Sequence, residues 1–411
     1  MKAFHTFDTN LRRNLLILFA AGLLFWSSTS MFLPVLPVYV KTLGNSEPEI
    51  GIIMGGFAIG LLLFRPTLGK LADKYSRKLV LLIGTAVAFL APFGYLSFTS
   101  IPMLILVRIF HGISVAAFTT GYSALVSDLS PVVRRGEIIS YMSLTAPIGF
   151  GMGLAMGEYL VDKVGYPGLF LFSSTLAFIG FLGTTKVINP PLQVYKQNSE
   201  KNHRFWQILL SQRVRVPALV MLLVGISVGS VHVFVSLFIK STPVDFNAGL
   251  FFMISAIASF SFRVFTGKAS DRFGRGLFIT FGVAAYVLAC VILSQANSTF
   301  AFILAAMAEG CGGGTVMSMI TTLMADRSLP HERGRIFALC IAGFDFGIAI
   351  AAPMLGFVAG KVGYHNMYGY TAALTSLGLI IFLTLSSKNT LESLRFALGR
   401  GSDAYSLNNR E

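Results

Sequence analysis

Five ionisable side chains lie inside long apolar stretches of this sequence: Arg108, His111, His232, Glu309 and Asp345. At membrane depth each would cost several kcal/mol unless it is paired or faces water, so such residues commonly mark ion or substrate pathways. A carboxyl group can take up and release a proton, histidine titrates near neutrality, and arginine keeps its proton and needs an anion from the protein or from a substrate. We therefore predict a proton-coupling or substrate cavity. The alternative of hydrogen-bonded structural groups stays open.

The composition excludes a soluble protein. Of 411 residues, 54% are apolar and only 12% are charged, with a mean hydropathy of +0.72, whereas a soluble domain carries about 25% charged residues. The net charge of +14 would suit nucleic acid, but the basic residues lie in short gaps between apolar blocks, so the predicted partner is a lipid bilayer and no nucleic acid. Cys290, Cys311 and Cys340 fall in apolar runs, which predicts neither disulfides nor a metal site, and no cofactor is expected.

About twelve apolar stretches approach the length of roughly 20 residues that spans a bilayer, and we expect each to be a helix. The first follows Arg12 and Arg13 but lacks a cleavage site, so it is expected to be a retained helix rather than a signal peptide. The predicted spans are 14–40, 50–68, 79–97, 101–126, 137–160, 167–185, 215–239, 247–266, 277–295, 299–324, 335–360 and 367–385.

The basic residues between these stretches predict the orientation. With the N-terminus inside, 25 of the 32 Lys and Arg residues fall in cytoplasmic segments, and only Lys41, Lys163, Lys240 and Lys361 fall in outer loops. Under the positive-inside rule this places both termini in the cytoplasm of a multi-pass protein of the cytoplasmic (inner) membrane. Arg65, Arg108 and Arg263 remain within helices.

The two halves of the chain repeat each other at a single offset of 198 residues. GKLADKYSRK at 69–78 matches GKASDRFGRG at 267–276, and KVGY at 163–166 recurs at 361–364. Asp128 also matches Asp326, and Phe64 and Arg65 match Phe262 and Arg263. We therefore predict an all-α integral membrane protein of two six-helix, pseudo-symmetric bundles. The predicted domains are an N-terminal bundle (1–186), a cytoplasmic linker (187–214), a C-terminal bundle (215–385) and a cytoplasmic tail (386–411).

The repeated loops could work as conformational switches. Their glycines could end a helix or admit a neighbouring backbone, and their aspartates could cap a helix or pair with arginine. A latch that forms in only one state would bias a two-state equilibrium, although the basic residues could also be simple membrane anchors. The predicted switch residues are Gly69, Asp73, Arg77, Lys78, Gly267, Asp271 and Arg275, and the glycines expected to pack helices are Gly112, Gly149, Gly153, Gly157 and Gly310.

These motifs resemble the major facilitator superfamily over about residues 1–385. GKLADKYSRK is similar to the family's loop signature, with Ser76 where Gly is usual, and Gly276 replaces the last basic residue of the second copy. LILVRIFHG is similar to the helix 4 signature built on Arg108 and Gly112. The resemblance implies two bundles that rock about a midplane cavity. Within the family the chain looks most like twelve-helix drug and metabolite proton antiporters, although their helix 5 motif is only half present, with Leu154 for Pro and Glu158 for the final Gly.

The resulting hypothesis is a secondary active transporter, working as a monomer, that exports a small lipophilic or amphiphilic solute in exchange for protons by alternating access. The first alternative is a facilitator or proton symporter that imports a sugar or an organic anion. A membrane-embedded enzyme or a non-transporting sensor is disfavoured. The sequence has no HExxH, phosphate-binding Gly-rich loop or Ser nucleophile elbow, and the residues after 386 are too few for an output domain.

Overall fold

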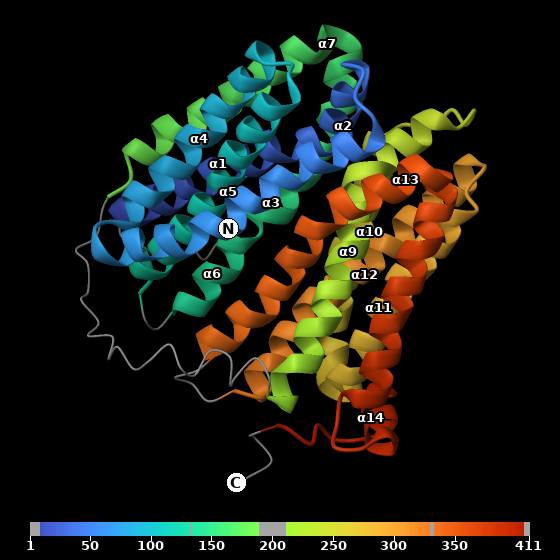
Figure 1. The fold of residues 1–411 in the computed structure, drawn as a ribbon. Coiled ribbons are helices and arrows are strands. Elements are labelled where there is room, and N and C mark those ends of the chain that lie inside the picture. The colour runs from blue at the N-terminus through green and yellow to red at the C-terminus, as the bar shows by residue number, and fades with distance from the viewer. Residues whose placement is uncertain (1–8, 132–133, 189–210, 329–332, 407–411) are drawn as a thin grey trace. The chain divides into compact units, whose positions relative to one another are not determined.

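A computed structural model of the chain describes residues 9–131, 134–188, 211–328 and 333–406, and nearly all of them are helical. They fall into two compact units, Met1–Lys196 and Gln197–Glu411 (Figure 1). The first contains α1 (Thr9–Ser30), α2 (Phe32–Thr42), α3 (Glu47–Lys74), α4 (Arg77–Ser97), α5 (Ile101–Leu129), α6 (Arg135–Ser143) and α7 (Thr145–Thr185). The second contains α9 (Gln212–Ser241), α10 (Ala248–Phe273), α11 (Arg275–Ser294), α12 (Thr299–Asp326), α13 (Arg333–Leu385) and α14 (Thr390–Ala397).

The described helices provide ten candidate membrane spans. Two of these, in α7 and α13, are long enough for two crossings each, and both are broken by a glycine with a positive φ angle, 70° at Gly165 and 78° at Gly363. Counting both halves of α7 and α13 gives the twelve crossings that the sequence predicts. The two breaks fall in the repeated KVGY motif, so the repeat is explained by a turn whose backbone conformation favours glycine.

Local sequence signals start many of these helices. Ser46 and Glu49 form a capping box at α3, and the Ser76 hydroxyl accepts a hydrogen bond from the backbone N–H of Leu79 at the start of α4. Asn247 caps α10 in the same way, and Ser298 caps α12. Each side chain satisfies an N–H group that the first helical turn leaves without a partner.

The helices continue beyond the apolar runs that predicted them. The second span was predicted at 50–68, yet α3 extends from Glu47 to Lys74, and only Tyr75 and Ser76 separate it from α4. Good helix formers such as Leu71, Ala72 and Lys74 carry the helix past the apolar stretch. The predicted loop 69–78 is therefore mostly helix. The predicted linker lies largely outside the described residues, and the predicted domain boundaries stay a prediction.

The two units use the same helix pairings. In the first, α1 packs on α7, α3 on α5, and α4 on both α5 and α7; in the second, α9 packs on α13, α10 on α12, and α11 on both α12 and α13. Each pairing in one unit is the repeat image of a pairing in the other. The prediction of two pseudo-symmetric all-α bundles is confirmed, and the candidate spans of the described residues are consistent with six crossings in each.

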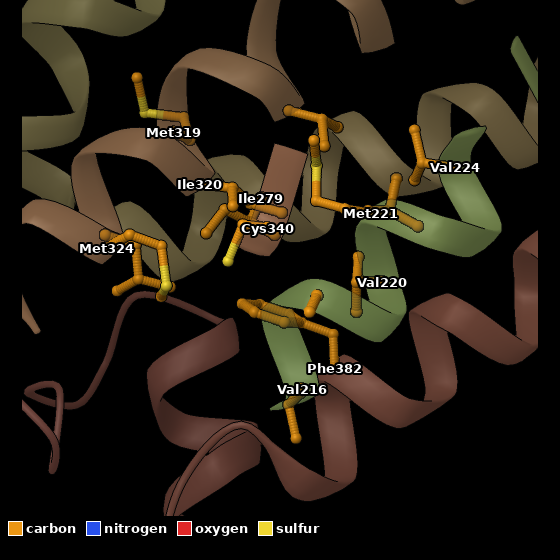
Figure 2. Packing of buried hydrophobic residues seen from close by; sticks show 14 of the residues in the cluster. Val216, Val220, Met221, Val224, Ile279, Met319, Ile320, Met324, Cys340 and Phe382 are labelled. Atoms are coloured by element: carbon orange, nitrogen blue, oxygen red, sulfur yellow. The ribbon is translucent and has the colours of Figure 1, made fainter. Parts of the chain in front are cut away.

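Each unit has its own apolar core. In the second unit, Val220 and Met221 of α9 face Ile279 of α11, Ile320 of α12 and Phe382 of α13 (Figure 2). Large apolar side chains also point outward: Leu63, Phe265 and Phe300 are 67%, 65% and 68% exposed. Exposure of this kind along every long helix would be unfavourable in water and is expected against lipid.

Candidate functional site

Glu309 occupies a buried position in the middle of α12. Its side chain is 6% exposed, and the carboxylate accepts a hydrogen bond from the Ser255 hydroxyl of α10. The next residue makes this contact possible: a Cβ on Gly310 would press against the Ser255 carbonyl and lie 2.7 Å from the Ala258 Cβ. Glycine therefore lets α10 and α12 cross closely enough for the serine to reach the carboxyl group.

A second polar group lies near Glu309. The Tyr286 ring of α11 packs against Gly312, three residues after Glu309 on the same helix. A carboxyl group at this depth must carry a proton or meet a cation. A serine hydroxyl can donate to the ionised form and accept from the protonated one. The arrangement around Glu309 can therefore hold a proton or release it.

Arg108 and His111 lie together in the first unit, as their spacing on α5 predicts. The Tyr95 hydroxyl of α4 is 3.1 Å from His111 Nδ1. The Phe57 ring of α3 lies edge to face with the imidazole, with 5.5 Å between the ring centroids. The Arg108 guanidinium stacks over the same Phe57 ring at 4.6 Å. Both side chains are buried, at 5% exposure for Arg108 and 1% for His111. Among the described residues no carboxylate pairs with Arg108, and its Nε atom has no hydrogen-bond partner. The site is a buried cation bordered by aromatic rings.

His232 and Asp345 are more open. His232 is half-buried on α9, with its ring 5.9 Å from that of Phe252, and Asp345 is half-buried on α13. Of the predicted cavity residues, Arg108 and His111 lie together on α5, while His232, Glu309 and Asp345 lie on α9, α12 and α13.

The repeated loop residues make one ion pair in each unit. Arg77, at the start of α4, pairs with Asp128 near the end of α5, and Arg275, at the start of α11, pairs with Asp326 at the end of α12. The four side chains are between 20% and 27% exposed. Each pair fixes the end of one helix to the start of another, at positions related by the repeat.

The other predicted switch residues differ from expectation in their local roles. Gly69 and Gly267 do not end helices: they lie inside α3 and α10, and a Cβ on either would meet no described atom within 4 Å. Asp73 is exposed and no described residue pairs with it. The two roles predicted for it are filled by other residues: Asp128 pairs with Arg77, and Ser76 caps α4. Lys78 donates to the Thr185 carbonyl at 2.7 Å. The side chain of Asp271 lies outside the described residues.

The predicted packing glycines lie where two backbones approach. A Cβ on Gly112 would press against the Phe57 carbonyl of α3, in the same way that Gly310 faces Ser255. On α7, a Cβ added to Gly149 would lie 2.7 Å from the Leu23 carbonyl oxygen of α1. A Cβ added to Gly157 would lie 2.6 Å from the carbonyl oxygen of Met31, the residue that follows α1. Gly153 packs between them on Ser27.

An apolar groove of about 320 Å³ lies beside the crossing of α1 and α7. Leu23 and Leu24 of α1 face Met152, Met156 and Phe172 of α7 across it. This lining suits an acyl chain or the apolar part of a solute.

Three polar residues near these sites were not singled out from the sequence. Tyr95 and Ser255 carry no charge and lie on helices whose neighbours the sequence does not specify, so no signal identified them. Glu158 is 7% exposed on α7. Its position in an apolar run directly after Gly157 was the available signal.

These two bundles, with ionisable groups buried between helices, define a multi-pass α-helical membrane protein. The family model for the Major Facilitator Superfamily matches residues 18–293 and 237–399, and the chain belongs to this superfamily of membrane transporters. It is 25% identical over 393 residues to an uncharacterised MFS-type transporter of Methanocaldococcus jannaschii, covering 91% of this chain and 99% of that one.

Three further proteins, one matched by sequence and two by structure, share less sequence identity with the chain. The chain is 22% identical over 362 residues to the quinolone resistance protein NorA of Staphylococcus aureus, covering 84% of this chain and 92% of that one. The nucleoside transporter NupG, in a variant form, superimposes with a TM-score of 0.77 at 17% identity over 90% of this chain and 98% of that one. A bacterial homologue of the lysosomal transporter Spinster gives a TM-score of 0.76 at 14% identity over 96% and 99%. At these identities the structural likeness shows the fold.

Proposed function

We propose that this protein is a proton-coupled exporter of a small lipophilic or amphiphilic solute. The single observation that carries the proposal is Glu309, a carboxyl group buried in the middle of α12 with a hydroxyl hydrogen bond from Ser255. The similarity to NorA, whose name connects it with quinolone resistance, favours export over import. The apolar groove beside α1 and α7 suits an apolar solute.

Proton coupling follows from the cost of charge at membrane depth. At membrane depth Glu309 is most stable as the neutral acid unless a cation approaches it, and when the site opens to water it can release its proton. Asp345, half-buried on α13, would respond in the same way. Solute and proton would then compete, and a membrane potential adds about 2.3 kcal/mol per charge per 100 mV to the exchange.

The orientation and the switch loops complete the proposal. We place the protein as a monomer in the cytoplasmic membrane with both termini inside, as the distribution of Lys and Arg predicts. Asp73 is exposed and unpaired among the described residues, so it is available for a latch that forms in only one state of the transport cycle. Such a latch would bias the equilibrium between inward-open and outward-open forms.

The test is proton-driven uptake into inverted vesicles with Glu309→Gln and Asp345→Asn. The side-chain amide in Glu309→Gln can still accept the serine hydrogen bond, so folding is retained while the titratable group is lost. We expect proton-driven uptake to fall to its level without a gradient, and exchange of solute for solute to persist. Asp245→Asn, in an exposed connection, is the matched control and should transport normally. Unchanged proton-driven uptake in both cavity variants would refute the assignment.

A second candidate function, transport of an organic anion, is favoured by Arg108. This buried guanidinium has no acidic partner among the described residues, and an arginine that cannot lose its charge needs an anion. Binding of an aryl carboxylate and of its uncharged methyl ester to the purified protein separates the two functions. Preference for the acid that is lost in Arg108→Gln supports the anion, and equal binding of acid and ester supports the lipophilic solute.

A further inference from the structure

The residues after the last membrane span fold back onto the second unit. Helix α14 and residues 398–406 lie at the end of this unit where α9 begins, α12 ends and α13 ends, with α14 at the foot of α11 and α13 (Figure 1). Asn389 starts α14 by accepting a hydrogen bond from the backbone N–H of Glu392 at 2.8 Å. We call residues 390–406 the C-terminal strap.

A fully buried arginine anchors the strap. Arg327 follows α12 and is 0% exposed, and its Nε and Nη2 atoms each donate to one carboxylate oxygen of Asp403 at 2.8 Å. Nη2 also donates to the Ser386 carbonyl at 3.0 Å, and Nη1 donates to the Arg213 carbonyl at 3.1 Å. One guanidinium therefore ties the strap to the beginning of α9, the end of α12 and the end of α13.

Aromatic residues of the strap cover this ion pair. The Phe396 ring lies 5.7 Å from the guanidinium and the Tyr405 ring 5.1 Å from it. The Tyr405 N–H donates to Asp403 at 3.1 Å, and its hydroxyl donates to Gln212 of α9 at 2.8 Å. Both charges are satisfied within the docked strap, which is the condition for a stable buried pair.

A second contact joins the strap to α11. A Cβ on Gly276 would press against the Phe396 carbonyl, and the Thr280 hydroxyl donates to the Ala397 carbonyl at 2.9 Å. Gly399, with a φ angle of 73°, turns the chain close to the start of α11. A Cβ added to Gly399 would lie 3.2 Å from the Leu277 Cβ. Glycine at 276 allows this approach, and the positive φ angle at 399 favours glycine there.

Both anchor positions are places where the second half departs from the first. At the repeat offset of 198 residues, Gly276 stands opposite Lys78 and Arg327 opposite Leu129. In the first unit Lys78 donates to the carbonyl of Thr185 at the end of α7. In the second unit Gly276 has no side chain, and the backbone of α14 at Phe396 lies against it. The substitutions that break the repeat thus coincide with the surface that receives the strap.

We propose that the C-terminal strap stays docked throughout the transport cycle and makes α9, α11, α12 and α13 move as one body. The proposal rests on the transport function proposed above, because α12 carries Glu309. Undocking would leave a buried charge without its partner, which makes a strap that opens in every cycle unfavourable. Asp403 and Arg327 are positioning residues: they touch no solute and act by holding the helix ends.

The first experiment breaks the anchor. Asp403→Asn keeps the size of the side chain but leaves Arg327 without its counter-ion, and we expect docking to weaken about 100-fold or more. Hydrogen exchange of the 390–406 amides should rise towards that of a free peptide. The amides of the helical core should lose at most tenfold in protection from exchange. Proton-driven transport should fall roughly tenfold or more, as expected when helix ends lose alignment. Glu392→Gln, exposed in α14, is the control.

The second experiment locks the strap in place. Leu277→Cys with Gly399→Cys, with the three native cysteines replaced, brings two Cβ atoms close to the separation of about 3.8 Å found in disulfides. The oxidised form should transport as fast as the reduced form, and oxidation should restore transport to Asp403→Asn. Gly399→Cys alone controls for the strained backbone at this position and for the contact of the new Cβ with the Phe273 carbonyl oxygen, 2.6 Å away.

The outcomes separate the alternatives. Loss of transport on oxidation, reversed by a reductant, would show that the strap must release and would overturn the proposal. Normal transport by Asp403→Asn together with faster exchange of the strap would overturn it as well, because transport would then not need a docked strap; unchanged exchange would overturn Asp403 as the anchor. If the wild type moves no solute against a proton gradient, the proposed function fails, while hydrogen exchange still decides whether Asp403 anchors the strap.

Discussion

The close crossing of α10 and α12 predicts opposite effects for two glycine-to-alanine substitutions in the second unit. Gly310 faces the Ser255 carbonyl and the Ala258 Cβ, at 2.7 Å from a Cβ added there. Gly267 lies inside α10, and a Cβ there would meet no described atom within 4 Å. The two variants make the same chemical change in a helix and differ in the space available.

The magnitudes follow from this difference. Alanine in place of glycine favours a helix by about 1 kcal/mol, so Gly267→Ala should stabilise the unit by up to that amount. At Gly310 the same gain is opposed by overpacking of about 1–3 kcal/mol, at the upper end because a backbone carbonyl cannot rotate away. The net effect is a destabilisation of about 2 kcal/mol. A domain of this size loses about 2–4 °C in Tm per kcal/mol, so Gly310→Ala should lower Tm by roughly 4–8 °C.

The assay uses the cysteines of the second unit. Cys290 and Cys340 are buried, at 0% and 2% exposure, and a thiol-reactive dye that fluoresces on labelling follows their exposure as the purified protein is heated. All three cysteines of the chain lie in this unit, so the first unit does not contribute to the signal. A Gly310→Ala protein that is as stable as the wild type, or a Gly267→Ala protein that is clearly less stable, would refute the packing argument.

Three further predictions concern the first unit, each measured by unfolding of the purified protein. Asp128→Asn removes the partner of Arg77 and should cost only about 0.5–1 kcal/mol, because both side chains are a fifth or more exposed; a double-mutant cycle with Arg77→Gln should give a coupling of that size, and zero coupling would contradict the pairing. Tyr95→Phe leaves the buried His111 Nδ1 without its hydroxyl partner and should cost about 1–3 kcal/mol. Gly165→Ala puts a side chain at a φ angle of 70° and should cost about 1–3 kcal/mol, whereas an unchanged Tm would mean that the turn between the two halves of α7 is not needed.

The sequence predicts the helices well because bilayer thickness and the absence of hydrogen-bonding solvent leave few alternatives. It also predicts that the two halves repeat each other. The ion pairs Arg77–Asp128 and Arg275–Asp326, which the sequence did not predict, fall at positions related by that repeat. It predicts the ends of helices poorly, because polar helical turns such as that at Lys74 continue in water without an apolar signal.

Contacts between distant residues are the part that the sequence could not predict. Ser255 meets Glu309 and Tyr95 meets His111 only because particular helices cross at particular glycines. Arg327 is the clearest example: as one of the basic residues between spans it counted towards the orientation, yet it is fully buried against Asp403. Charge alone does not distinguish a solvated anchor from the centre of a hydrogen-bond network.

One crossing, present in both halves, shows how symmetric structure and asymmetric chemistry are combined. Gly112 packs on Phe57 and Gly310 on Ser255, and these four positions are related by the offset of 198 residues. The residues beside the glycines are His111 and Glu309, so the same place holds an imidazole against an aromatic ring in one unit and a carboxyl group against a hydroxyl in the other. Because the backbone approach is retained while the side chains differ, the packing of each bundle does not require a carboxyl group at this position. This difference supports the proposed role of Glu309 as the group that carries the proton.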